Sequence, residues 1–180
     1  DPSEIIDAYG ADTARLYMMS DSPPDRDLEW TDAGIQGSWR FLNKIWRMIE
    51  RFSDEVDHSA TSAPRNFDPL NPLHKEMHKT IANVTNDLDR FHFNRAVARI
   101  REFTNSVYSF DIRTEDAAWL RIQCYNTIVR LISPIVPHIA EELWQMLGND
   151  KCLYQTTWPQ WDPTLLEDET AVIAIQVNGR

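Results

Sequence analysis

The chain has 180 residues, 42% of them hydrophobic, and seven tryptophans, which is enough to bury one well-packed domain. Its formal net charge is −10, and no apolar run approaches the roughly 20 residues that a membrane span requires. Cys124 and Cys152 lack the spacing of a disulfide framework or a CxxC pair, so we expect two free thiols in a reducing compartment. These features exclude a secreted disulfide scaffold and predict a soluble, cytoplasmic monomer that does not bind membranes.

The first predicted elements are two short helices. Asp1 can cap a helix that has Pro2 at its first position, and Gly10 ends it. Asp12 is expected to cap the second helix. Because the chain starts in a helix cap without an initiator methionine, we interpret it as a fragment of a longer protein.

A loop over residues 21–30, which Trp30 is expected to anchor, leads to a long amphipathic helix with Thr31 as its N-cap. Apolar residues at steps of three and four predict its core-facing side: Ile35, Trp39, Leu42, Trp46 and Ile49. A second set has similar spacing and is entirely cationic: Arg40, Lys44, Arg47 and Arg51. These four residues, called the cationic stripe below, fall within a strip about 60° wide that faces away from the apolar side.

Four further helices are predicted. The first begins near Asn71, the second follows a turn around "FHFN", and the last two begin near Thr114 and Pro137. The same spacing gives the core-facing residues of the first three: Leu73, Met77, Ile81, Val84 and Leu88; Ala96, Val97, Ile100, Phe103 and Val107; Ala118, Ile122, Tyr125, Val129 and Ile132. The run "TAVIAIQVNGR" at residues 170–180 predicts a truncated β-strand that has no partner in the chain. The fold class is therefore all-α, an up-and-down helical bundle.

The sequence contains no obvious catalytic or metal-binding group and no glycine-rich phosphate loop. Glu141 and Glu142 point about 100° apart on a helix, so we interpret them as acids of its first turn. His74 and His78 have the i, i+4 spacing of a metal-binding pair but no evident third ligand, which favours surface histidines. His138 is expected to form a hydrogen bond within the bundle.

The cationic stripe is the strongest candidate for a function. A solvated outer face is the simpler interpretation of charge on an amphipathic helix. A chain with 28 acids and 18 bases is expected to mix signs there, and like charges at i, i+4 repel, so a polyanionic partner would explain the single sign. A second group of cations, Arg90, Arg95, Arg99 and Arg101, is weaker because Arg95 and Arg99 can pair with Glu102.

Four segments, in the same order, resemble the C-terminal part of bacterial leucyl-tRNA synthetases: "GADTARLYMMSDSPPDRDLEWTDAGIQGSWRFLNKIWR", "FHFNRAVARI", "LISPIVPHIAEELWQMLG" and "TTWPQWDPTLLEDETAVIAIQVNGR". The resemblance covers essentially the whole chain. "PHIAEELW" is shared among related class I synthetases, whereas "DLEW" and "RFLNKIWR" resemble the leucine branch more narrowly.

The resemblance implies three parts. Residues 1–30 would follow the KMSKS loop and contact the tRNA, residues 31–150 would form the helical anticodon-binding domain, and residues 151–180 would be a linker and the start of the next domain. The implied partner is tRNA-Leu, held by its backbone because leucine tRNAs carry differing anticodons. Arg40 and Lys44 match the family's tRNA-contacting helix most closely, and Arg47 and Arg51 continue it with less support.

The parent enzyme implied by the resemblance is a ligase that attaches leucine to tRNA with ATP and Mg²⁺. Its HIGH and KMSKS signatures are absent from this sequence, so we expect no catalytic residue, metal or cofactor here, and no aminoacylation by the chain alone. A helical protein–protein scaffold is the alternative. The sequence pI of about 4.9 supports that alternative, since nucleic-acid-binding domains are commonly basic.

Overall fold

The computed structural model describes residues 2–55, 63–110 and 115–167, and within these ranges it contains seven α-helices and two 3-10 turns but no strand. The elements are α1 (Pro2–Tyr9), α2 (Ala11–Asp21), α3 (Asp32–Glu55), α4 (Pro72–Asp89), α5 (Phe93–Ser109), α6 (Glu115–Ile132), α7 (Pro137–Met146), η1 (Leu153–Gln155) and η2 (Pro163–Leu165). The all-α class is thus confirmed. The predicted terminal strand and the caps at Asp1 and Thr114 lie outside the described residues.

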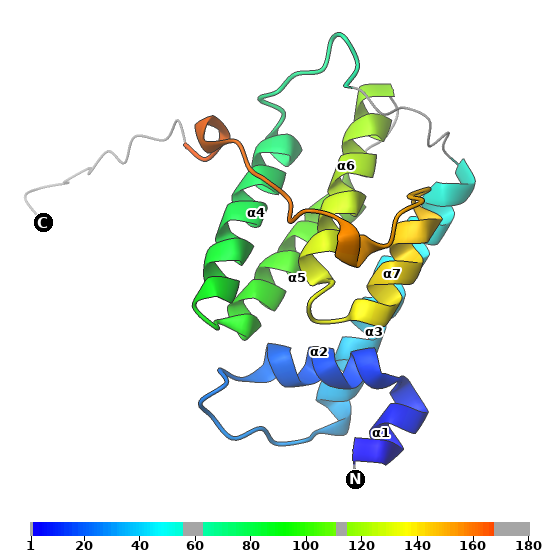
Figure 1. Cartoon of the computed structure of the whole chain (residues 1–180), viewed down its shortest axis with the longest axis vertical. Helices are drawn as coiled ribbons and strands as arrows, with labels where there is room; N and C mark the ends of the chain where they lie inside the picture. The colour runs from blue at the N-terminus through cyan, green and yellow to red at the C-terminus, as the bar shows by residue number, and fades with distance from the viewer. Residues whose placement is uncertain (1, 56–62, 111–114, 168–180) are drawn as a thin grey trace, which may run out of the picture.

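Helices α3 to α7 run up and down beside one another, and α2 lies across one end of them, next to α1 (Figure 1). The N-terminal pair is attached to the bundle through contacts of α2 with α3, α5 and α7. None of the helices in the described ranges is both long and apolar enough to cross a membrane.

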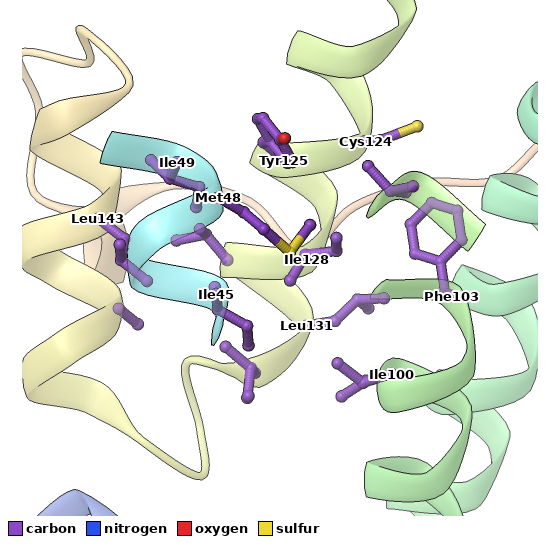
Figure 2. Packing of buried hydrophobic residues seen from close by; sticks show 14 of the residues in the cluster. Ile45, Met48, Ile49, Ile100, Phe103, Cys124, Tyr125, Ile128, Leu131 and Leu143 are labelled. Carbon is purple, nitrogen blue, oxygen red and sulfur yellow. The ribbon is translucent and has the colours of Figure 1, made fainter. Parts of the chain in front are cut away.

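The hydrophobic core is centred on α6. This helix has buried residues on several of its sides, not only along one apolar face. Figure 2 shows α6 side chains between those of α3, α5 and α7, with Ile128 and Leu131 in the middle of the cluster. Cys124 is buried and free, and burial raises the pKa of its thiol. The prediction that Ala118 faces the core is wrong, because Ala118 is half-buried and its neighbour Ala117 is buried instead.

The apolar side of α3 is rotated from its predicted position. Its buried residues are Ile35, Ser38, Phe41, Leu42, Ile45, Met48, Ile49 and Phe52. Trp46 is half-buried, and Trp39, predicted to be in the core, is 42% exposed. At 100° per residue the buried side is centred roughly 70° from the predicted one, because the apolar face is wide and the two tryptophans lie at one of its edges.

The predicted helix starts are confirmed at α3 and α4 and wrong at α2. The Thr31 hydroxyl accepts from the Gly34 N–H at 3.2 Å, and the Asn71 side chain accepts from the Leu73 N–H at 3.0 Å. Asp12 lies inside α2, whose N-cap is Gly10.

Asp12 instead caps a distant helix. Its carboxylate accepts from the Ile139 N–H at 2.7 Å and lies 2.8 Å from His138 Nδ1, which satisfies an end of α7. The predicted hydrogen bond of His138 is thereby confirmed. Glu141 has a similar long-range role, because it accepts from the backbone N–H of Leu153 at 2.8 Å in η1 and is not an acid of the first turn of α7.

A tight contact joins α2 to α3. An added Cβ at Gly34 would lie 2.3 Å from the Tyr17 ring. Tyr17 also holds the loop between α2 and α3. Its hydroxyl donates to the Glu29 carbonyl at 2.5 Å, and its ring centre lies 5.4 Å from that of Trp30. Tyr17 therefore anchors this loop, and Trp30, the predicted anchor, contacts the Tyr17 ring while it is itself 41% exposed.

Candidate functional site

The cationic stripe lies on the outer side of α3. Arg40, Arg47 and Arg51 are exposed and Lys44 is half-buried. All four line one open groove of about 610 Å³, which is bordered by α3, the C-terminal end of α5, and α6. The predicted placement of the four residues on one face is confirmed, and their binding role stays a prediction.

The rest of this groove combines a further cation and several aromatic rings with Asn43 and Met48. Arg121 on α6 is a fifth cation, and its Nη2 donates to the Phe110 carbonyl. Aromatic rings come from Trp39 and Phe52 on α3, Tyr108 on α5 and Tyr125 on α6. None of the described residues that line the groove is Asp or Glu. Such a lining favours an anionic ligand, although the chain as a whole has a net charge of −10.

Lys44 is held in place by α5. Its Nζ donates to Asn105 Oδ1 at 2.6 Å and lies 4.6 Å from the ring centre of Tyr108. Neither contact neutralises the charge of the ammonium group. Lys44 is therefore a positioned cation at the border between α3 and α5.

The three stripe arginines, Arg40, Arg47 and Arg51, form no ion pair among the residues that the structure describes. Like charges at this spacing cost a few tenths of a kcal/mol per pair. An external anion would offset this cost.

Two residues of the second group of cations, Arg95 and Arg99, form ion pairs with the same carboxylate. Asp87 on α4 is 0% exposed, and its carboxylate accepts from Arg99 Nε at 2.6 Å and lies 3.5 Å from Arg95 Nε. These ion pairs fasten α4 to α5. The prediction that Arg95 and Arg99 pair with Glu102 is therefore wrong. Arg101 stacks on a phenylalanine of α3, and burial lowers its pKa.

The two histidines of α4 form a hydrogen-bonded chain. Both are half-buried, so they lie at the surface with part of each ring covered. His78 Nδ1 accepts from the Asp162 N–H at 2.9 Å, the two Nε2 atoms are 3.2 Å apart, and His74 Nδ1 lies 2.9 Å from the Pro69 carbonyl. This order requires a proton on His78 Nε2 and on His74 Nδ1, with both rings neutral.

Burial, and secondly the repulsion that a protonated His74 would exert, lowers the pKa of His78. These hydrogen bonds therefore tether the segment before η2 to the first half of α4. No group of three or more His, Cys, Asp or Glu that could hold a metal is present in the described part of the protein.

Two aromatic residues of the groove cannot be recognised from the apolar spacing alone. Trp39 is predicted to be in the core because it lies at one edge of the apolar spacing of α3. Tyr108, which is 58% exposed, has no neighbouring pattern that singles it out. The sequence signal that could have placed Trp39 outside the core is a second apolar series on α3, formed by Phe41, Ile45 and Met48, which centres the buried face away from Trp39.

A family model for the "Anticodon-binding domain of tRNA ligase" matches residues 72–180. Over the whole chain, the sequence is 47% identical to a leucine–tRNA ligase of Rhodospirillum rubrum and 43% identical to one of Syntrophobacter fumaroxidans. The chain spans only 21% and 22% of the length of these two relatives.

Two solved structures have the same arrangement of helices. The first is the ternary LeuRS–tRNA–LeuAMS complex of Agrobacterium radiobacter K84, with a TM-score of 0.81 and 28% identity over 94% of this chain and 22% of that one. The second is apo methionyl-tRNA synthetase of Mycobacterium tuberculosis, with a TM-score of 0.68 and 16% identity over 91% of this chain and 41% of that one, a likeness of fold alone. On the family match and the helical architecture, the chain belongs to the anticodon-binding domain family of tRNA ligases and corresponds to that domain of leucyl-tRNA synthetases.

Proposed function

We propose that this chain holds tRNA-Leu in a leucine–tRNA ligase through contacts between the cationic stripe and tRNA phosphates. The observation that carries this proposal is the groove with five cations and no acid among its described lining residues. The similarity of the chain to a LeuRS found in a complex with tRNA supports the same partner.

The stripe suits phosphate contacts rather than base reading. Arginine can bind phosphate oxygens bidentately, and lysine acts as a point charge. Such contacts fix the register of the nucleic acid without encoding sequence. Because Lys44 is already held by Asn105, it loses less side-chain freedom on binding than a mobile surface lysine would.

The activity of the whole ligase is proposed to require parts beyond these 180 residues. There, ATP and Mg²⁺ would activate leucine, while this chain positions the tRNA and carries out no catalytic step. We expect the chain to be a monomer in this role. We assign catalysis to other parts of the ligase because this chain spans only about a fifth of the length of its relatives.

Single substitutions test the phosphate contacts. Arg40→Ala and Arg47→Ala should each weaken binding of tRNA-Leu by roughly 1 kcal/mol, about fivefold in Kd. Lys44→Ala should weaken it similarly and also remove the contact to Asn105. The matched control is Arg90→Ala, which deletes an exposed cation near the opposite end of α5 from Tyr108, outside the groove.

Filter binding at low salt, with thermal midpoints as a folding check, gives the result. Equal affinities for the wild type and all the stripe variants would refute the proposal. A loss with Arg90→Ala as large as with Arg40→Ala would show that only total charge matters. Binding of an acidic protein through the stripe, with no tRNA binding, would favour the scaffold alternative.

A further inference from the structure

We propose that His74 and His78 together bind a divalent transition metal ion that prefers imidazole nitrogen, such as Zn²⁺, and that the bound ion loosens the segment before η2 from α4. This inference is independent of tRNA binding. It requires two nitrogen lone pairs that can converge on one ion, support for the rings and access from solvent.

The two Nε2 atoms are spaced as two ligands of one ion. They lie 3.2 Å apart, on side chains about one turn apart in α4. Two nitrogens that bind one zinc ion tetrahedrally, at about 2.0–2.1 Å each, are separated by about 3.3–3.4 Å. Both rings are half-buried, so each keeps part of its surface open to solvent. Replacing the hydrogen bond by a chelate therefore needs a rotation of the rings rather than a shift of α4.

His74 already has the tautomer that a metal ligand requires. Its Nδ1–H donates to the Pro69 carbonyl at 2.9 Å, which leaves the lone pair on Nε2. A backbone carbonyl on the other ring nitrogen is a common support of a metal-binding histidine, because it fixes the tautomer and the orientation of the ring. The Phe67 ring adds to this support, with its centre 5.1 Å from that of His74.

His78 has the opposite tautomer, and this couples metal binding to the neighbouring segment. Its Nε2 carries the proton because its Nδ1 accepts from the Asp162 N–H at 2.9 Å. To bind an ion through Nε2, His78 must carry that proton on Nδ1 instead, where it would face the Asp162 N–H donor to donor. A bound ion and this hydrogen bond therefore exclude each other. The Trp158 Nε1–H, which donates to the Thr85 hydroxyl at 2.8 Å, still holds the start of the segment.

Asp162 places a negative charge beside the pair. Its Oδ1 accepts from the Thr164 N–H at 2.9 Å and from the Thr164 hydroxyl at 2.7 Å. These hydrogen bonds are the main cause of the lowered pKa of Asp162, so the carboxylate is ionised at neutral pH and attracts a cation. No third His, Cys, Asp or Glu completes a metal-binding set with the pair in the described ranges, so water takes the remaining positions on the ion.

The test titrates Zn²⁺ at neutral pH into the Cys152→Ser chain, in which the exposed thiol cannot compete for the ion, and follows the imidazole nitrogens by NMR. Zn²⁺ should shift Nε2 of both His74 and His78 and move the His78 proton to Nδ1. His74→Ala and His78→Ala should each weaken binding at least about 10-fold, a loss that even an outer-shell substitution causes. His138→Ala, at a histidine outside α4, is the control. Mg²⁺, which prefers oxygen ligands, should shift neither nitrogen.

Amide exchange gives the second readout. Zn²⁺ should speed the exchange of the Asp162 N–H and leave the amides of α5 unchanged. Zn²⁺ affinity that neither histidine variant lowers would overturn the site. Nε2 resonances that Zn²⁺ leaves unshifted in the Cys152→Ser chain would also overturn it, even if a histidine variant failed to fold. Binding that needs both histidines but leaves the exchange of the Asp162 N–H unchanged would overturn the coupling to the segment.

Discussion

Replacing Gly34 by alanine should destabilise the protein, although alanine is the better helix former. The added Cβ would lie 2.3 Å from Cε2 and 3.1 Å from Cζ of Tyr17, whereas carbon atoms normally approach to about 3.5–4.0 Å. Tyr17 is 2% exposed, and its hydroxyl bonds to the Glu29 carbonyl at 2.5 Å. The ring therefore cannot move away without disturbing both the core and the loop before α3.

The magnitude follows from three contributions. Overpacking costs about 1–3 kcal/mol, loss of the Tyr17 hydrogen bond costs about 1 kcal/mol, and the gain in helix propensity returns about 1 kcal/mol. Gly34→Ala should thus lower the free energy of unfolding by about 1–3 kcal/mol. Gly37→Ala, in the same helix and with nothing within 4 Å of its added Cβ, should raise it by about 0.5–1 kcal/mol.

Urea denaturation followed by far-UV circular dichroism measures both variants against the wild type. We expect the two midpoints to move in opposite directions, with unchanged slopes. If Gly34→Ala were as stable as Gly37→Ala, the close packing of α2 on α3 would be wrong. The same result would mean that the Tyr17 ring does not require a glycine at position 34.

Two further predictions concern buried polar groups. Asp87→Asn should lower the free energy of unfolding by about 2–4 kcal/mol, because it leaves the arginines of α5 without their buried counter-charge. The control, Asp89→Asn at an exposed residue, should change it by less than about 0.5 kcal/mol. Equal effects of the two variants in urea denaturation would contradict the role of Asp87. The folded-state pKa of His78 is lowered from 6.5, so the unfolded state binds more protons than the folded state below about pH 6.5. The contribution of His78 to the free energy of unfolding should therefore be fully present above that pH and be lost as the pH falls. His78→Phe should make this dependence shallower, and an unchanged pH profile of the unfolding free energy would refute it.

Most of the fold could be predicted from local sequence signals. Thr31, Asn71 and Pro137 mark helix starts through capping and backbone chemistry that acts within a few residues. The buried residues of α5 follow one apolar seam, and all five predicted there are buried. Such signals depend on neighbours in the sequence, so a single chain is enough to find them.

The errors involve partners far apart in the sequence. Asp12 had the right chemistry for a cap, but it caps a helix more than a hundred residues away. Asp87 lay in a predicted helix, and nothing local showed that two arginines of the next helix would enclose it. Trp39 lies on the apolar spacing of α3 but at its edge, and spacing alone does not show which edge the neighbouring helices cover. Because Trp39 is predicted to be buried, its place in the lining of the groove cannot be predicted. The four stripe residues can be predicted, since their charge and spacing are local properties.

The most direct test of the central claim is the salt dependence of tRNA-Leu binding. Each phosphate contact contributes about −0.7 to −0.9 to the slope of log K against log salt concentration. The triple variant Arg40→Ala, Arg47→Ala and Arg51→Ala should therefore reduce the magnitude of the slope by about 2–3, and Arg90→Ala should leave it unchanged. Parallel lines for the wild type and the triple variant would show that the stripe makes no contact with tRNA phosphates.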